Sequence, residues 1–192
     1  GDATSPGVSY RVAYKPVLFA ALLKHHGQLG PAEIPAKRDW TYRHVQWLGH
    51  SLGVPLAMPA AHPFNPLPLL RLALACSTPD APGQVNRYVA ELVLRHVWEG
   101  GADAVAPERV AALHATLADH MAQRGRELAD PNADAVKQQL RANTEEALAA
   151  GAFGVPSFVV DDKLFWGLDG LPMLKACLQG DAWFDGPGWD SA

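Results

Sequence analysis

A proline between a helix end and a strand start constrains this chain more than any other feature. Helix-type sequence ends at Gly151, and the step Val155-Pro156 leads directly into a β-branched and aromatic run that begins at Ser157. Proline cannot donate to a β-ladder, so at the entrance of a strand it marks a bend. An ordinary trans proline at a plain strand start is the alternative interpretation.

The order of the expected strands and helices along the chain indicates the fold class. A strand at 8–17 is followed by a long helical run, and two short strands joined at Asp161-Asp162 precede a last helix. The expected helices cover 17–26, 36–52, 66–78, 83–99, 107–124, 131–150 and 169–179, and the last strands cover 157–161 and 163–166. A terminal hairpin and helix form the second half of a thioredoxin-like fold. We therefore expect an α/β, thioredoxin-like domain of residues 1–33 and 151–192, with an all-helical domain inserted at 34–150.

The composition excludes several classes of function. The net charge is −4, whereas nucleic-acid binders usually concentrate basic residues on one face. No apolar segment is long enough for a membrane span and no signal peptide is visible, so we expect a cytoplasmic protein without membrane or nucleic-acid partners. The eight histidines lack the spacing of a metal site. Cys76 and Cys177 form no CxxC motif, which argues against a dithiol oxidoreductase, and both lie in apolar runs typical of buried cysteine.

A set of motifs along the chain resembles one known family. The stretch from Gly151 to Leu174 is similar to the carboxy-terminal signature of 2-hydroxychromene-2-carboxylate isomerases. Further matching segments are Tyr14–Val17, His26–Pro31, Pro35–Arg38, Pro63–Asn65 and Asn143–Ala147. Members of this family have a DsbA-like thioredoxin fold related to that of kappa-class glutathione transferases. They bind glutathione and convert a hydroxychromene carboxylate into an open-chain benzylidene pyruvate in bacterial degradation of naphthalene-type compounds.

The resemblance implies a glutathione site at the strand entrance. It implies a cis bond before Pro156, which leaves the main-chain groups of Val155 free to pair with the tripeptide as an added strand. The implied glutathione-binding residues are Val155, Pro156, Leu168, Asp169 and Gln28, and the implied substrate-binding residues are Lys37 and Asn65. Asp169 would accept the ammonium of the γ-glutamyl group, serve as a plain helix N-cap, or do both.

Three positions depart from the family's pattern. Gln28 stands where Asn is frequent, His44 stands where Asp is common, and Gly170 stands where many members carry Arg. The absent Arg removes one glutathione contact that the resemblance would otherwise imply. Lys37, with Arg38 beside it, would neutralise the carboxylate of the substrate, although such a basic run is also typical of a solvated helix face.

The amino terminus departs further from the family. Its members place a long helix after the first strand, opened by a Ser-Pro motif whose hydroxyl stabilises the glutathione thiolate. Ser5-Pro6 resembles that motif, yet the second strand follows at once. Either a segment is absent from the sequence as it stands, or the chain is a shortened relative. Ser5 is the expected catalytic hydroxyl, Ser9 is the second candidate, and a terminal serine without any role is the alternative.

The sequence leaves more than one function open. An isomerase is expected first, and a kappa-like transferase would use the same thiolate on other electrophiles. A non-catalytic protein that binds glutathione or a small acid is the third reading. Family members tend to be dimers, so a homodimer is expected. The stripe formed by Trp40 and Trp47 is expected to belong to the core rather than to a ligand platform.

Overall fold

The chain folds into two compact units, which a computed structural model describes for residues 2–5 and 8–191. One unit consists of Gly1–Val12 and Glu145–Ala192, and the other consists of Ala13–Thr144. The helix α6 (Asp134–Ala149) contributes to both, because the division falls within it. The domain limits expected after residues 33 and 150 stay a prediction.

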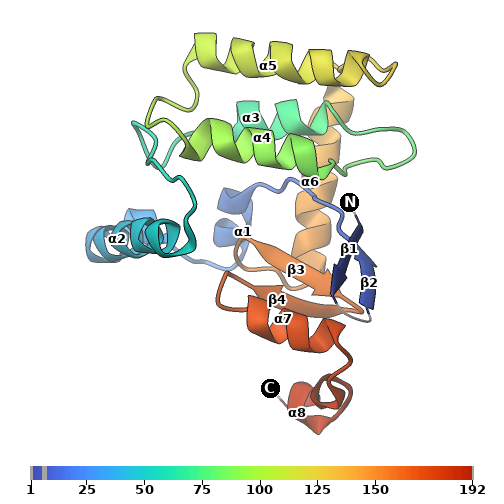
Figure 1. Ribbon diagram of the computed structural model, residues 1–192. Helices are drawn as coiled ribbons and strands as arrows, with labels where there is room; N and C mark the ends of the chain where they lie inside the picture. Colours follow the sequence, from blue (N-terminus) through green and yellow to red (C-terminus); the bar gives the residue numbers. More distant parts are fainter. Residues whose placement is uncertain (1, 6–7, 192) are drawn as a thin grey trace. The chain divides into compact units, whose positions relative to one another are not determined.

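Two antiparallel hairpins form the sheets of the described residues. They pair β1 (Asp2–Ser5) with β2 (Val8–Arg11), and β3 (Ser157–Val160) with β4 (Lys163–Trp166) (Figure 1). The strand expected at 8–17 is therefore too long, because β2 ends at Arg11. The cause is tertiary: the carbonyl of Tyr14 accepts a hydrogen bond from the Val85 N–H of the helical unit at 2.9 Å.

The β3–β4 hairpin carries the core of the first unit. Its turn residues Asp161 and Asp162 have φ values of 47° and 63°, a left-handed conformation that Asp tolerates better than most residues. Phe165 is buried and lies 5.8 Å from Phe184 and 5.5 Å from Trp189, measured between ring centroids. The elements after β4 are α7 (Leu171–Leu178), η2 (Ala182–Asp185) and α8 (Pro187–Asp190). The carboxy-terminal aromatic residues thus pack on the hairpin.

The core of the second unit lies among three helices. They are α3 (Leu67–Leu74), α4 (Arg87–Trp98) and α5 (Pro107–Ala122), which Figure 1 shows stacked together. Leu72, Val89 and Leu117 are each at most 1% exposed and belong to this core. Burying one such side chain stabilises a fold by about 1.5–3 kcal/mol relative to leaving it in water. The other buried members are Leu69, Ala73, Cys76, Val85, Val97, Ala104, Leu113 and Met121.

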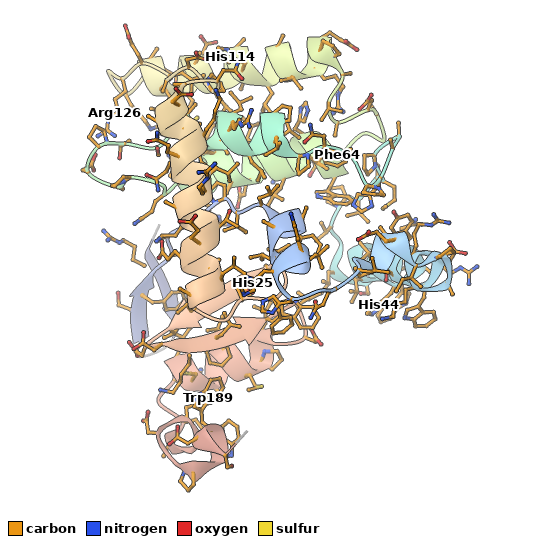
Figure 2. The ribbon with its side chains drawn as sticks, turned by 180° about the vertical axis from the view of Figure 1, so that it is seen from behind. His25, His44, Phe64, His114, Arg126 and Trp189 are labelled. Carbon is orange, nitrogen blue, oxygen red and sulfur yellow. The ribbon has the colours of Figure 1, made fainter. Side chains whose placement is uncertain are left out.

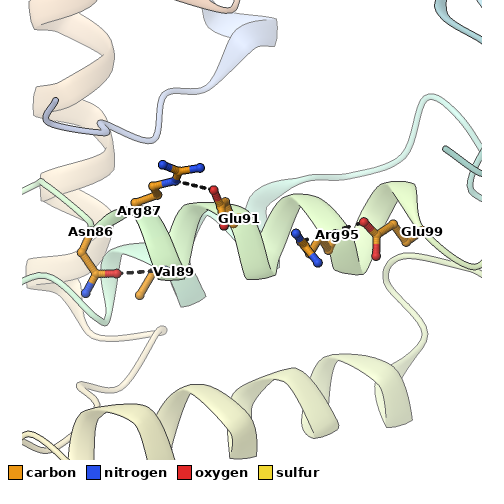
Figure 3. A network of polar contacts seen from close by, with 6 residues as sticks. All are labelled: Asn86, Arg87, Val89, Glu91, Arg95 and Glu99. Atoms are coloured by element: carbon orange, nitrogen blue, oxygen red, sulfur yellow. Dashed lines mark hydrogen bonds and ion pairs between the residues drawn. The ribbon is translucent and has the colours of Figure 1, made fainter. Parts of the chain in front are cut away.

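Local contacts add to the stability of α4, as Figure 3 shows. Asn86 is the N-cap, and its Oδ1 accepts a hydrogen bond from a backbone N–H three residues on, at 2.9 Å. Arg87 pairs with Glu91, and Arg95 pairs with Glu99 at 3.9 Å, both at i,i+4 spacing. Exposed pairs of this kind contribute about 0.3–0.5 kcal/mol each. The helix therefore depends mainly on its buried face.

A buried asparagine on α6 fastens two distant segments of the helical unit. Asn143 is 2% exposed, and its Nδ2 donates to the carbonyl of Pro16 at 3.0 Å and to that of Gly83 at 2.8 Å. The neighbouring Thr144 hydroxyl accepts a hydrogen bond from the Leu18 N–H at 3.1 Å. These two residues open one of the matching segments of the sequence, and their contacts here are structural.

Helix α2 (Pro35–Leu52) buries only Gly49, although its length matches expectation. The preceding elements of the unit are α1 (Phe19–His25) and η1 (Pro31–Glu33). Trp40 and Trp47 are 68% and 60% exposed, so the expectation that they belong to the core is wrong. Their rings lie near-parallel on either side of His44, with centroids 6.3 Å from it. The periodicity of the stripe is present, but the stripe faces solvent.

Among the described residues, no helix combines the length and apolarity needed to cross a membrane.

Candidate functional site

The chain leaves α6 through a glycine turn. Gly151 has a φ of 82°, and the N–H groups of Gly151 and Ala152 donate to carbonyls of the last helical turns at 2.9 Å each. This Schellman arrangement satisfies the end of the helix. The bond between Val155 and Pro156 is cis, which confirms the prediction made from the sequence.

An aromatic ring lies directly on the backbone of this turn. A Cβ on Gly154 would overlap the indole of Trp166, so only glycine allows the ring this position. Phe153 contacts the same indole, with ring centroids 5.0 Å apart. The Ser157 hydroxyl donates to the Gly154 carbonyl at 2.7 Å. The turn before β3 is thus held by a ring on one side and by a hydrogen bond on the other.

The main-chain groups of Val155 lie just outside the hairpin ladder. The strands end where Ser157 is opposite Trp166, and one further bond joins the Gly167 N–H to the Pro156 carbonyl at 3.0 Å. Val155 is the next residue on that edge, and its side chain is 43% exposed. Within residues 2–5 and 8–191, no hydrogen bond engages its N–H or C=O. A residue with both main-chain groups unused at a strand edge can pair with an extended peptide.

Two glycines shape the loop between β4 and α7. Gly167 has a φ of 80°, a conformation that L side chains rarely adopt. Gly170 has an ordinary φ of −76°, but a Cβ there would overlap the carbonyl oxygen of Trp166. The backbone as it stands therefore excludes the Arg that the family resemblance would place at residue 170.

Asp169 lies in this loop with an unused carboxylate. The N-cap of α7 is Gly170 and no side chain caps the helix, so the interpretation of Asp169 as a plain N-cap is wrong. The Oδ1 instead lies beside Gly167, where a Cβ would fall 2.5 Å from it. Asp169 is exposed, and its carboxylate makes no hydrogen bond or ion pair with any residue that the structure describes.

Exposed apolar side chains surround the open end of the hairpin. Continuing the register by two residue pairs beyond Ser157 and Trp166 places Leu168 opposite Val155. Leu168 is 47% exposed and Trp166 is 45% exposed. This end of the hairpin therefore offers a main-chain donor and acceptor, a carboxylate, and an apolar surface next to one another.

Three other predicted site residues lie in the helical unit, where all are exposed. Gln28 follows α1, and Lys37 lies in the first turn of α2. Asn65 Oδ1 accepts a hydrogen bond from the Leu67 N–H at 3.1 Å at the start of α3, which gives this side chain a structural role. Roles of these residues toward a ligand stay predictions.

The predicted thiolate-stabilising hydroxyl cannot be placed. Ser5 ends β1 opposite Val8, but its side chain lies outside the described part of the chain, as does Pro6 altogether. Ser9, the second candidate, is exposed on β2.

The thiols and the acidic side chains suggest no further chemistry. Within the described ranges, no three His, Cys, Asp or Glu side chains gather into a group that could hold a metal ion. Both cysteines are free: Cys177 is half-buried, whereas burial of Cys76 raises the pKa of its thiol to about 12.

Sequence reasoning missed a histidine with aromatic neighbours on the loop between α2 and α3. His62 is half-buried, its Nδ1 lies 2.7 Å from the Tyr42 hydroxyl, and burial lowers the pKa of the imidazole. Phe64 and Trp98 lie 6.2 and 5.4 Å from its ring centroid. Figure 2 labels Phe64 on this loop and His44 on α2. His62 stands immediately before the matching segment Pro63–Asn65, which is the signal that could have drawn attention to it.

Comparison with known proteins decides the family. The family described as "DSBA-like thioredoxin domain" matches residues 3–179, nearly the whole chain. This chain belongs to the DsbA-like thioredoxin family. Its α/β, thioredoxin-like architecture with a helical insertion is the one that the sequence predicts.

The DsbA-like chain is similar to two kappa glutathione transferases and to one solved isomerase. Glutathione S-transferase kappa 1 of Rattus norvegicus is 26% identical over 181 residues, which cover 90% of this chain and 79% of that protein. The Homo sapiens protein of the same name is 29% identical over 181 residues, covering 88% and 77%. A structure of selenomethionine 2-hydroxychromene-2-carboxylate isomerase matches with a TM-score of 0.70 at 20% identity, covering 90% of this chain and 81% of that one. At that identity, the structural match shows the shared fold alone.

Proposed function

We propose that this chain is a glutathione-dependent isomerase of 2-hydroxychromene-2-carboxylate-type intermediates of aromatic degradation. The open end of the β3–β4 hairpin carries the proposal. There Val155 offers an unpaired N–H and C=O, and the loop opposite holds the unused carboxylate of Asp169. A tripeptide with an extended cysteinyl unit and a free ammonium group fits both features.

The relatives support glutathione more strongly than they support one reaction. Both curated relatives are named as glutathione S-transferases, whereas the solved structure is named as an isomerase. A kappa-like glutathione transferase is therefore the second candidate function. The homodimer and the cytoplasmic location expected from the sequence are part of the proposal.

The residues at the hairpin fit glutathione, with one contact fewer than the family resemblance implies. Val155 would pair with the cysteinyl unit, Leu168 would donate its N–H, and Asp169 would hold the ammonium group. Gly170 supplies no guanidinium, so the γ-glutamyl carboxylate would depend on main-chain donors. Bound glutathione would supply a thiolate able to add reversibly to a conjugated double bond.

The remaining candidates would act on the substrate and on the thiol. Lys37 would neutralise the carboxylate of the substrate, because an exposed ammonium is free to approach it. Asn65 would donate from its amide nitrogen, since its Oδ1 is already engaged at the start of α3. Gln28 would contact glutathione in place of the Asn that is frequent in the family. The Ser5 hydroxyl would favour the thiolate by hydrogen bonding to it.

Calorimetric titration with glutathione tests the hairpin site. Asp169→Asn removes the charge that would hold the ammonium, and we expect the affinity to fall by about fivefold, the effect of roughly 1 kcal/mol at an exposed pair. Asp162→Asn is the matched control, because Asp162 is an exposed turn residue with φ of 63°, which Asn adopts readily. A glutathione analogue methylated at the cysteinyl nitrogen should also bind at least about fivefold more weakly, because the Val155 carbonyl loses its donor.

Turnover assays then separate the candidate functions. Conversion of 2-hydroxychromene-2-carboxylate that requires glutathione supports the isomerase. Conjugation of glutathione to an aryl halide without isomerisation supports the transferase, and heat of binding without either reaction supports a non-catalytic binder. Equal affinity of the parent protein and Asp169→Asn would contradict the site itself.

A further inference from the structure

Helix α2 presents two tryptophan side chains to solvent on one face. Trp40 and Trp47 are 68% and 60% exposed, and at about 100° per residue they lie about 20° apart around the helix. Their rings flank that of His44, which Figure 2 labels, at interplanar angles of 22° and 17°. Within residues 2–5 and 8–191, neither indole N–H has a hydrogen-bond partner. A ring with an apolar body and one polar N–H favours a boundary between water and an apolar phase.

The opposite side of α2 fixes the direction of this face. Gly49 is buried and lies about 180° around the helix from Trp40. A Cβ on Gly49 would lie 3.1 Å from the Cβ of Leu56, so the helix backbone packs closely on the loop that follows it. On the same side, the Tyr42 hydroxyl donates to the carbonyl of His62 in that loop at 3.0 Å. The tryptophan face therefore points away from the segment on which the helix packs.

Basic residues border the tryptophan face on both sides. Lys37 and Arg43 lie about 60° to either side of Trp40, and both are exposed. Neither has an ion-pair partner in the part of the chain that the structure describes, whereas Arg38 pairs with Asp39 at 3.6 Å. The helix thus carries three lysine or arginine residues against one acidic residue, a formal charge of +2 on a chain whose net charge is −4. This face is complementary to an anionic surface.

We propose that α2 binds the surface of an anionic membrane, with Trp40 and Trp47 among the lipid headgroups and Lys37 and Arg43 beside the lipid phosphates. A helix of this kind lies in the plane of the interface and does not cross the bilayer. Tryptophan is enriched at the level of the headgroups, and each Lys or Arg beside an anionic leaflet strengthens binding by about fivefold. The proposal departs from the expectation of no membrane partner, which considers spanning segments, and it does not depend on the proposed function.

A second copy of the chain fits this face less well than a lipid surface does. In a twofold-symmetric contact the same face meets itself, so Lys37 and Arg43 of both copies would come together. Like charges that meet across an interface weaken it, and Asp39 is already paired with Arg38. The homodimer expected from the sequence should therefore use another surface.

Co-sedimentation of the full chain with lipid vesicles tests the proposal. Phosphatidylcholine vesicles with about one-third phosphatidylserine should bind the protein at least about tenfold more tightly than phosphatidylcholine alone, and about 0.5 M salt should remove most of the difference. Combined Trp40→Ala and Trp47→Ala, and separately Arg43→Glu, should each weaken binding to the anionic vesicles by at least about tenfold. Leu94→Ala and Arg141→Glu are the matched controls and should leave binding unchanged, because Leu94 is 58% exposed on α4 and Arg141 is exposed on α6.

Circular dichroism and size-exclusion chromatography of the same variants distinguish the other occupants of this face. All the substituted side chains are exposed, so each variant should keep the helicity and the elution volume of the parent. Equal binding of the parent to both kinds of vesicle, or an equal loss in Arg43→Glu and Arg141→Glu, overturns the proposal. A tryptophan double variant that converts a dimer into a monomer shows that a second copy covers the face, which also overturns it. Binding of poly-glutamate as tight as that of anionic vesicles would identify an acidic protein surface as the partner and would reject the membrane.

Discussion

Removing the amide of Asn143 should destabilise the helical unit more than any exposed polar substitution. Its Nδ2 is the donor for two carbonyls, those of Pro16 and Gly83, which come from segments far apart in the sequence. The side chain is 2% exposed, so water cannot replace the lost donor without rearrangement. Asn143→Ala leaves both carbonyls unpaired.

The size of the effect follows from these contacts. Each lost hydrogen bond to a buried acceptor costs about 1–1.5 kcal/mol, so the loss of both costs about 2–3 kcal/mol. Asn143→Asp keeps the shape but turns a carboxylate toward the same two carbonyls, which should cost about 3–5 kcal/mol near neutral pH. Burial would raise the pKa of this carboxyl above its unfolded value. The variant's deficit is then largest at high pH and shrinks as the pH falls and the carboxyl is protonated.

Urea unfolding followed by circular dichroism measures both variants. The midpoint should fall while the slope stays unchanged, which identifies a change in stability alone. Asn132→Ala is the control, because the Asn132 side chain is exposed and only its backbone N–H is hydrogen-bonded. A free energy of unfolding for Asn143→Ala within about 0.5 kcal/mol of the control would refute the reasoning. So would an Asn143→Asp deficit that grows as the pH falls.

Three further predictions follow from the described contacts. Gly170→Ala should lower the free energy of unfolding by about 1–3 kcal/mol, because its Cβ would overlap the Trp166 carbonyl. Gly186→Ala is the control and should be neutral in the same thermal melt, because its Cβ would lie 3.7 Å from the nearest atom. Equal melting temperatures of the two variants would contradict this prediction. Burial lowers the pKa of His120, with Arg124 as the second cause, so the folded state binds fewer protons than the unfolded one just below the unfolded pKa of about 6.5. Stability from this group is complete above that value and is lost as the pH falls toward the folded pKa, and His120→Gln should therefore lose less stability between pH 7.5 and 5.5 than the parent. Cys76, with a thiol pKa raised to about 12, should react with a disulfide reagent at pH 8 far more slowly than the half-buried Cys177. Two thiols that react equally fast would contradict this prediction. So would a fast-reacting thiol that is still present in Cys177→Ser.

The parts of the fold that depend on neighbouring residues could be predicted from the sequence. The helix expected at 36–52 is present as α2, and the turn expected at Asp161-Asp162 joins two strands, because local backbone preferences determine both. The strand expected at 8–17 is too long, because Tyr14 pairs with Val85, a partner that no local pattern reveals. The expectation that the stripe on α2 lies in the core is wrong, because periodicity shows which residues share a face but not what that face meets.

The same distinction applies to the candidate site. The hairpin and the proline at its entrance are continuous in sequence, so the sequence alone predicts their geometry. Of the two interpretations of Asp169, the helix N-cap is wrong, because α7 starts at Leu171 and Gly170 takes the capping position. The contact between Tyr42 and His62 joins a helix to a loop twenty residues away, and only the folded chain brings them together.

The solvent-exposed indoles of α2 allow changes around that helix to be followed by tryptophan fluorescence. Trp40 and Trp47 are 68% and 60% exposed, and they flank a histidine ring that can quench them. A soluble quencher would reach these two more readily than Trp166 and Trp183, which are 45% and 48% exposed. Whatever covers α2, whether another macromolecule or a change in its own contacts, would therefore shift the emission of the protein without any added dye.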